Sequence, residues 1–211
     1  MYRLIKTTCE FVGRLFSFLI PANLPELCRA VTAHIYTGYQ RHRFACFGDD
    51  SVIAYKATNL YGLDCVSIGN GTQIGRGIQL TAWNELTETK NSKTEIVIGD
   101  NCNIRDNCHI TAAVSIRIGN NLLTGTNVLI TDNSHGTTDR SMTDIHPQQR
   151  PLASKGPVVI GNNVWLGNNV CIMPGVTVGD GAIVGANSVV THDIPPYSVA
   201  AGIPARIIKQ M

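Results

Sequence analysis

His135 is the residue of this chain best placed to do acid–base chemistry. It stands in Asp132-Asn-Ser-His135-Gly136, inside a long polar segment. A neutral imidazole titrates close to physiological pH, so it can accept a proton from a hydroxyl group. Asp132 or a backbone carbonyl could hold the ring in the required tautomer. A loop histidine taken alone is more often a solvated residue, so its role depends on the elements around it.

Other residue types narrow the chemistry further. The chain has seven cysteines, an odd number, and they show no C-x-x-C or Cys/His ligand spacing. Reduced thiols in a cytoplasmic protein are the simplest interpretation. The net charge is +2, charged residues make up 15% of the chain, and no basic run occurs. We therefore expect no metal cofactor and no nucleic-acid partner.

An internal repeat of six residues must position these groups. An aliphatic residue recurs at every sixth position in the last third of the chain, and a smaller residue follows four positions later. The first row is Ile160, Leu166, Ile172, Val178, Val184 and Val190; the second is Val164, Val170, Val176, Ala182 and Ser188. The same phase appears at Ile68, Ile74 and Leu80, at Ile98, Ile104 and Ile110, and, after a two-residue slip, at Ile118, Thr124 and Ile130.

A period of six fits neither an amphipathic helix nor an array of hairpins. It fits a mainly β solenoid whose coil is a triangle of three short strands, with coils stacked about 4.8 Å apart. Glycine, asparagine and aspartate cluster between the aliphatic positions, where they tolerate positive φ at the corners. Cys102 and Cys108 fall on the inward second row, so we expect small core residues rather than reactive thiols.

The repeat divides the chain into an N-terminal helical segment (1–45), a solenoid (46–192) and a C-terminal tail (193–211). Two polar insertions interrupt the solenoid, at 81–95 and at 131–157, and loops on a rigid scaffold often carry function. In the first segment Leu24, Leu27, Ala30 and Val31 share one helical face. An earlier apolar run, 15–20, is too short to span a bilayer. We expect a helix packed on the body without membrane contact; an interfacial helix is the alternative.

Several motifs together resemble the hexapeptide-repeat acyltransferases over residues 50–211. They are the aliphatic-Gly repeats, the loop with Asp132-Asn-Ser-His135-Gly, the segment Ile160-Gly-Asn-Asn-Val-Trp-Leu-Gly, and the tail Asp193-Ile-Pro-Pro-Tyr-Ser-Val-Ala-Ala-Gly-Ile-Pro-Ala-Arg206. The chain looks most like the galactoside and maltose O-acetyltransferases and the related O-acetyltransferases of polysaccharide assembly. The resemblance implies a single-stranded left-handed parallel β-helix. It also implies a homotrimer with active sites in the clefts between subunits.

The activity implied by the resemblance is transfer of an acetyl group from acetyl-CoA to a hydroxyl of a sugar or glycan precursor. Such a transfer needs a base, donors for the tetrahedral oxyanion and a channel for coenzyme A. The thioester is already activated, so direct attack suffices without a covalent intermediate. His135 matches the catalytic base of the family, and the backbone N–H of Asn168 matches its oxyanion donor.

The resemblance also assigns binding residues. Asn107 and Asp132 are expected on the acceptor side. Trp165, Gly185, Ala186, Thr191, His192, Arg206 and Lys209 are expected along coenzyme A. His192 departs from the family, which usually has lysine there, so the grip on the phosphates could be weaker or pH-sensitive. The N-terminal 45 residues also depart from the galactoside branch, so its acceptor preference is not carried over.

Three other functions remain to be separated. An N-acetyltransferase acting on an amino sugar, free or nucleotide-linked, would use a similar mechanism. A zinc-dependent carbonic anhydrase can share the fold but needs three histidines, including an H-x4-H pair, and His109, His135 and His146 lack that spacing. A non-catalytic scaffold would not need His135 or Trp165.

Overall fold

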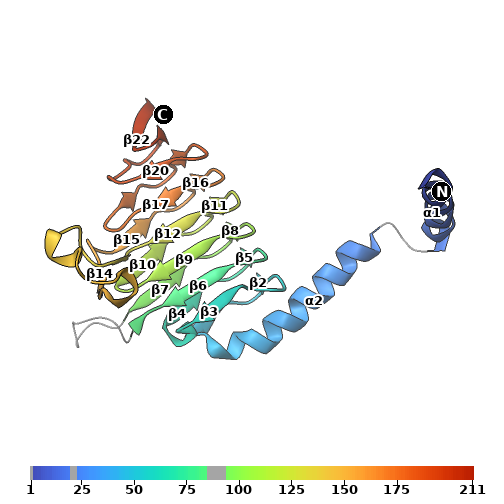
Figure 1. Cartoon of the computed structure of the whole chain (residues 1–211). Coiled ribbons are helices and arrows are strands. Elements are labelled where there is room, and N and C mark those ends of the chain that lie inside the picture. The colour runs from blue at the N-terminus through green and yellow to red at the C-terminus, as the bar shows by residue number, and fades with distance from the viewer. Residues whose placement is uncertain (1, 20–22, 85–93) are drawn as a thin grey trace.

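The computed structural model describes residues 2–19, 23–84 and 94–211. From Cys46 onward the chain winds as a left-handed β-helix whose three faces are parallel sheets (Figure 1). The first sheet contains β1 (Cys46–Phe47), β4 (Val66–Ile68), β7 (Glu95–Ile98), β10 (Ser115–Ile118), β15 (Val158–Ile160) and β18 (Thr177–Val178). This architecture confirms the fold class expected from the six-residue repeat.

The other two faces follow the first in each coil. The second sheet contains β2 (Val52–Ile53), β5 (Gln73–Ile74), β8 (Asn103–Ile104), β11 (Leu123–Thr124), β16 (Trp165–Leu166) and β19 (Ile183–Val184). The third contains β3 (Asn59–Tyr61), β6 (Gln79–Ala82), β9 (His109–Ala112), β12 (Leu129–Thr131), β17 (Cys171–Ile172) and β20 (Val189–Val190). Neighbours within each sheet belong to successive coils, so residues of equal phase stack directly on one another.

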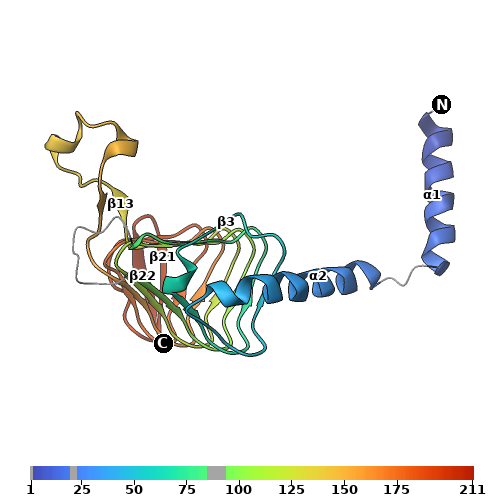
Figure 2. The same cartoon turned by 90° about the horizontal axis from the view of Figure 1, so that it is seen from below.

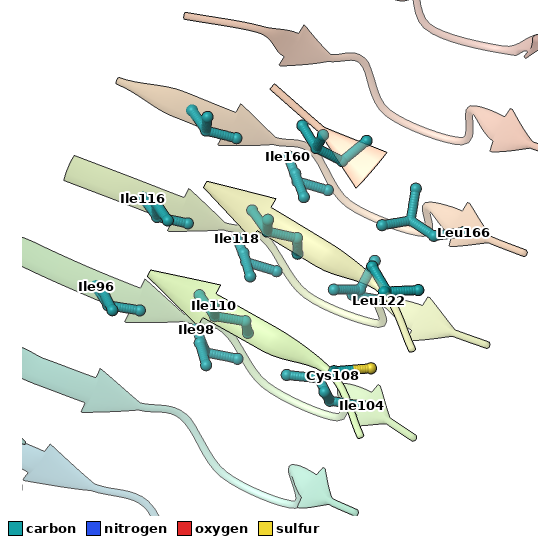
Figure 3. Packing of buried hydrophobic residues seen from close by; sticks show 14 of the residues in the cluster. Ile96, Ile98, Ile104, Cys108, Ile110, Ile116, Ile118, Leu122, Ile160 and Leu166 are labelled. Carbon is teal, nitrogen blue, oxygen red and sulfur yellow. The ribbon is translucent and has the colours of Figure 1, made fainter. Parts of the chain in front are cut away.

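The core consists of aliphatic ladders inside the prism. Ile98, Ile118 and Ile160 lie in register on the first sheet and are almost fully buried (Figure 3). Cys102 and Cys108 fill the smaller inward positions, and burial raises the pKa of both thiols above its ordinary value. Each coil covers its apolar side only with its neighbours, so the stack folds cooperatively.

The expected C-terminal tail extends the second sheet. β21 (Ser198–Gly202) lies parallel to β19, and β22 (Ala205–Gln210) returns antiparallel to β21. At the opposite end of the solenoid, two helices, α1 (Tyr2–Leu19) and α2 (Leu24–Gln40), precede the first strand. The hairpin therefore closes one end of the rod, and α2 adjoins the other (Figure 1).

The N-terminal helices differ from the sequence expectation in how they pack. α2 contacts the solenoid through Ala33, Thr37 and Gln40, and the Ile53 N–H donates to the Thr37 hydroxyl at 2.9 Å. The predicted apolar face, in contrast, points away: Leu27 is 56% exposed and Val31 is 48% exposed. Helix α1 (Tyr2–Leu19) has no buried side chain among its described residues, so its expected packing on the body is not found.

The first insertion is shorter than predicted. Thr81 and Ala82 continue strand β6 and are buried, because they pair with Thr111 and Ala112 of the next coil. The polar segment therefore begins after Ala82, and residues 85–93 lie outside the described residues. The second insertion contains a two-stranded ribbon, β13 (Ser134–His135) and β14 (Leu152–Ala153), which projects on the side of the solenoid opposite α2 (Figure 2).

Candidate active site

The antiparallel ribbon holds His135 beside the third sheet. His135 pairs with Leu152, and the Gly136 N–H donates to the Pro151 carbonyl at 2.8 Å. Gly136 has a φ of 78°, a left-handed conformation that glycine adopts without strain, and it lets the chain turn directly after the histidine. The His135 side chain is exposed. A short strand pair thus presents an accessible imidazole at the root of the long loop.

This imidazole borders a groove of about 780 Å³. One wall comes from the loop, through Ser134, His135 and residues 148–152, and the floor comes from the third sheet. The floor and rim include Asn59, Gln79, Thr81, Trp83, His109, Thr111, Leu129, Thr131, Asn133 and Met173. Of the described lining residues, none is an aspartate or a glutamate, and most of the polar ones carry hydroxyl or amide groups. Such a lining suits a neutral, hydrogen-bonding ligand.

A row of threonines makes this floor. Thr81, Thr111 and Thr131 occupy the same position in successive coils and are all nearly buried. The Thr81 hydroxyl donates to Thr111 Oγ1 at 2.9 Å, and Trp83 Nε1 donates to the same oxygen at 3.1 Å. Trp83 also stacks on Tyr61 with ring centroids 4.7 Å apart. The hydrogen bonds fix the indole at the edge of the groove.

His109 lies in the same groove on strand β9, between Gln79 and Leu129 of the adjacent coils. Burial lowers the pKa of His109 from its ordinary value of 6.5, because desolvation penalises the charged imidazolium. The sequence left open whether this residue faces the site or is a neighbour in a ladder. It lines the groove that His135 borders, and it is half-buried.

Asp132 was expected on the acceptor side or as the orienting partner of His135, but the structure buries it in a corner of the solenoid, outside the lining of the His135 groove. Its side chain is 0% exposed. Its carboxylate accepts the backbone N–H groups of Ala113, Val114 and Ser115 at 2.7–2.8 Å. These residues form the corner where the repeat slips by two positions. Asp132 therefore satisfies the donors that the widened corner leaves unpaired.

Asn107 lies in a corner ladder rather than in the His135 groove. Its φ is 59°, and its backbone N–H donates to the Arg76 carbonyl at 2.7 Å. A Cβ placed on Gly77 would clash with Asn107 Oδ1, so the amide packs tightly over that glycine. The side chain is exposed, but the groove lining does not include it. Contact between Asn107 and an acceptor stays a prediction.

A second groove, of about 350 Å³, lies on the second sheet. It brings together four of the residues expected along coenzyme A and at the oxyanion, together with small neighbours. The lining residues are Gly125, Trp165, Gly167, Asn168, Ile183, Val184, Gly185 and Ala186. Trp165 is 51% exposed at the start of β16, between Leu123 and Ile183 of adjacent coils. A large indole beside several glycines leaves a narrow apolar channel.

The backbone N–H of Asn168 differs from equivalent N–H groups of the solenoid because the residue beside it in the next coil offers no side-chain acceptor. At the other corner the equivalent N–H groups donate to side-chain oxygens one coil on, as Asn120 does to Asn162 and Asn162 does to Asp180. The Thr126 N–H likewise donates to Asn168 Oδ1 at 2.9 Å. The position that would receive the Asn168 N–H is Ala186, whose methyl group accepts no hydrogen bond. A donor is therefore left open inside the Trp165 groove.

The predicted phosphate-binding residues lie near the C-terminal hairpin. His192 and Arg206 line a shallow cavity of about 360 Å³. Thr191 Oγ1 lies 2.9 Å from His192 Nδ1, so these neighbours form one polar pair. Lys209 lies farther along β22, opposite Val199, and is outside that lining. Binding of a coenzyme phosphate by these residues stays a prediction.

The predicted catalytic and cofactor residues do not meet on one chain. His135 borders a groove on the third sheet, whereas Trp165, Asn168, Gly185 and Ala186 line a groove on the second. Within the described residues no group of three His, Cys, Asp or Glu side chains could hold a metal ion. The geometry thus presents two separate grooves, one bordered by an imidazole and one that contains an open backbone N–H.

The groove that His135 borders also contains residues that the sequence interpretation missed, notably Trp83, Arg150 and the threonine row. A signal for the threonines is present, because the same hexad phase carries Leu80-Thr81-Ala82, Ile110-Thr111-Ala112 and Ile130-Thr131. Arg150 carried no such signal; its Nε donates to the Ile145 carbonyl at 3.0 Å within the loop. Its place depends on the fold of that loop.

Comparison with known proteins identifies the repeats. Residues 157–192 match the bacterial transferase hexapeptide (six repeats), and residues 95–132 match the hexapeptide repeat of succinyl-transferase. No curated protein sequence matches the chain.

Solved structures share the fold. A mutant of AntD, an N-acyltransferase from Bacillus cereus in complex with dTDP and coenzyme A, superposes with a TM-score of 0.67 at 21% identity, covering 85% of this chain and 90% of that one. Another AntD mutant, in complex with dTDP-4-amino-4,6-dideoxyglucose and coenzyme A, gives 0.65 at 21% identity over 83% and 88%. A hexapeptide-repeat-containing acetyltransferase from Vibrio cholerae gives 0.54 at 25% identity over 84% and 80%.

Proposed function

We propose that this chain, whose repeats match those of the hexapeptide transferases, moves an acetyl group from acetyl-CoA to a hydroxyl of a sugar or glycan precursor. The observation that carries the proposal is the exposed imidazole of His135 at a groove lined by hydroxyl and amide side chains. A base beside neutral hydrogen-bonding groups is what deprotonation of a sugar hydroxyl requires.

In this mechanism His135 takes the proton of the acceptor hydroxyl while the oxygen attacks the thioester carbonyl. The carbonyl oxygen becomes an oxyanion, and the Asn168 N–H donates to it. Support for this role comes from Ala186, which leaves the N–H without the side-chain acceptor found at equivalent positions. Collapse of the tetrahedral intermediate releases coenzyme A as the thiol, which takes up the proton from the imidazolium. No covalent enzyme intermediate is needed.

The pantetheine arm would lie beside Trp165, where Gly185 and Ala186 allow close approach of a ligand. Since the His135 groove and the Trp165 groove lie on different sheets of one chain, we propose that a second copy joins them. A homotrimer would place the His135 face of one chain against the Trp165 face of its neighbour three times. His192, Arg206 and Lys209 would then bind the coenzyme's phosphates.

The lining of the groove favours a hydroxyl acceptor over an amine. An amino sugar is largely protonated near neutral pH, and an ammonium group is best held by a carboxylate. The described lining of the His135 groove contains no carboxylate, and Arg150 adds a positive charge. N-acetylation is therefore the second candidate, and it requires an acceptor that enters as the free amine.

A thiol-release assay with acetyl-CoA tests the function across a panel of neutral sugars and matched amino sugars. We expect release to depend on a neutral sugar, and the acetylated product to be cleaved by alkaline hydroxylamine, because esters react and amides do not. A hydroxylamine-resistant product would establish N-acetylation instead. The proposal is contradicted if the folded protein releases no thiol with any acceptor of the panel. Stoichiometric zinc in the purified protein would favour the carbonic anhydrase alternative.

A further inference from the structure

Helix α1 carries a largely apolar face that nothing in the described chain covers. Ile5, Phe11, Val12, Leu15 and Phe16, the α1 apolar face, are between 42% and 62% exposed. Phe11 and Leu15 are four residues apart, as are Val12 and Phe16, and Ile5 lies seven residues before Val12. These spacings place all five side chains on one side of the helix. Figures 1 and 2 show α1 beyond the end of α2, away from the solenoid.

The opposite side of α1 is polar and net basic. Lys6, Glu10, Arg14 and Ser17 follow one another at spacings of four, four and three residues. The only carboxylate of this row, Glu10, lies 3.8 Å from the Lys6 ammonium group, and the Ser17 hydroxyl donates to the Arg14 carbonyl at 2.7 Å. One of the two cations is thus compensated, and Arg14 remains to attract negative charge.

These two faces define what α1 fits. Large apolar and aromatic side chains on one side and basic residues on the other are the features of helices that lie in a membrane interface. No described helix is long and apolar enough to cross a membrane. A coiled coil would need only a narrow seam, whereas Phe11 and Phe16 widen the face on both sides of the row Ile5, Val12, Leu15.

We propose that α1 lies in the interface of an anionic lipid surface, with its apolar face among the acyl chains and Lys6 and Arg14 at the headgroups. This inference is independent of the proposed acetyl transfer, which needs no membrane. It implies that the solenoid is attached to a lipid surface through α2 and the segment before it, while its grooves remain in water.

Flotation of the full chain with lipid vesicles tests the proposal. Vesicles of phosphatidylglycerol mixed with phosphatidylcholine should carry the protein, and vesicles of phosphatidylcholine alone should carry less. The double variant Phe11→Ser/Phe16→Ser should lower binding by about tenfold or more, because it removes two large aromatic side chains that the acyl chains would otherwise bury. Lys6→Gln/Arg14→Gln should lower binding to the anionic vesicles while leaving binding to neutral vesicles nearly unchanged.

A matched control removes the same amount of exposed apolar surface from α2. Leu27 and Ile35 are 56% and 69% exposed, so Leu27→Ser/Ile35→Ser should leave flotation within about twofold of the original. Thermal unfolding of each variant checks that the solenoid is intact. The proposal is overturned if the unmodified chain fails to float with anionic vesicles, or if both serine pairs reduce flotation equally. It is also overturned if the α1 pair changes the sedimenting mass but not flotation, which would assign the face to a second copy.

Discussion

The solenoid and the N-terminal helices use apolar residues in opposite ways. In the solenoid, aliphatic side chains repeat every six residues and point into the prism, and the coils above and below cover them. In α1 and α2, large aliphatic side chains repeat every three or four residues, and Ile5, Leu15, Leu27 and Val31 among them are exposed. The six-residue period specifies its own partner, namely the next coil. The helical period specifies a face and leaves its partner open.

The difference extends to function. Within the solenoid, the groove bordered by His135 combines a loop that interrupts the repeat with a row of threonines inside it, and the Trp165 groove is built from residues of the repeat itself; we propose that these two grooves are the half-sites of the active site. No described residue of α1 lines either groove, and its apolar and basic faces are the ones that we propose attach the chain to a lipid surface. We expect substitutions in the two regions to separate cleanly, with turnover and stability affected by the solenoid and lipid binding affected by α1.

Loss of the imidazole should have the largest effect. His135→Ala should lower turnover by about 10²–10⁴-fold, because the acceptor hydroxyl loses its base. Initial rates of thiol release measure this. His146→Ala, in the same loop but outside the groove lining, is the matched control and should retain near-normal turnover. Near-normal activity of His135→Ala would remove the proposed base.

Isoleucine truncation compares the two regions directly. Ile116 is fully buried in strand β10, whereas Ile35 on α2 is 69% exposed. Ile116→Ala should lower the free energy of unfolding by about 2–5 kcal/mol through lost burial and a residual cavity. Ile35→Ala should change it by less than about 0.5 kcal/mol. Denaturant unfolding of both variants measures these changes. Equal losses of unfolding free energy in the two variants would contradict the comparison.

A side-chain acceptor placed beside the Asn168 N–H should lower turnover and leave the fold intact. Ala186→Asn supplies the side-chain oxygen that accepts the equivalent N–H at other corners, so it should bind the Asn168 N–H. Removing one oxyanion donor costs about 10²–10³ in turnover. Unfolding and turnover should be measured together. A variant that is as active as the original chain would exclude the Asn168 N–H from the oxyanion site.

The smallest effect concerns pH. The folded-state pKa of His109 lies below its ordinary value of 6.5, so the unfolded chain takes up this proton at a higher pH than the folded chain. The corresponding stability is complete above about pH 6.5 and is lost as the pH falls through the lowered pKa. His109→Gln should flatten the fall of the melting temperature over this acidic range. Identical slopes for the two proteins would contradict the burial of a neutral imidazole.

The sequence predicted the solenoid well because a solenoid buries its core between neighbours at one fixed spacing. The family resemblance assigned Trp165, Gly185 and Ala186 to one ligand, and the repeat explains why they lie in one groove: Trp165 pairs with Ile183 of the next coil, and Gly167 lies against Gly185 and Ala186. The two-residue slip was also visible. The structural consequence of this slip could not be predicted from the sequence. A carboxylate three residues before a histidine gives the same sequence pattern whether it binds an acceptor or accepts hydrogen bonds from a corner, and Asp132 accepts them from the corner.

The remaining misses depend on contacts between segments far apart in sequence. Trp83 enters the groove only because its indole donates to Thr111 of the next coil. The packing of α1 and α2 could not be predicted, since amphipathicity identifies a face but not what covers it. The side of α2 with Ala33, Thr37 and Gln40 contacts the solenoid, whereas Leu27 and Val31 remain exposed.

Mixed oligomers test the central claim, that two half-sites on different sheets are joined by a second copy. Chains carrying His135→Ala and chains carrying Ala186→Asn should each be nearly inactive. Produced together in equal amounts, they form some interfaces in which an intact His135 meets an intact Asn168 donor. Random assembly predicts recovery of about a quarter of the original activity. If the mixed protein, shown to contain both chains, stays as inactive as either parent, the joined half-sites do not exist.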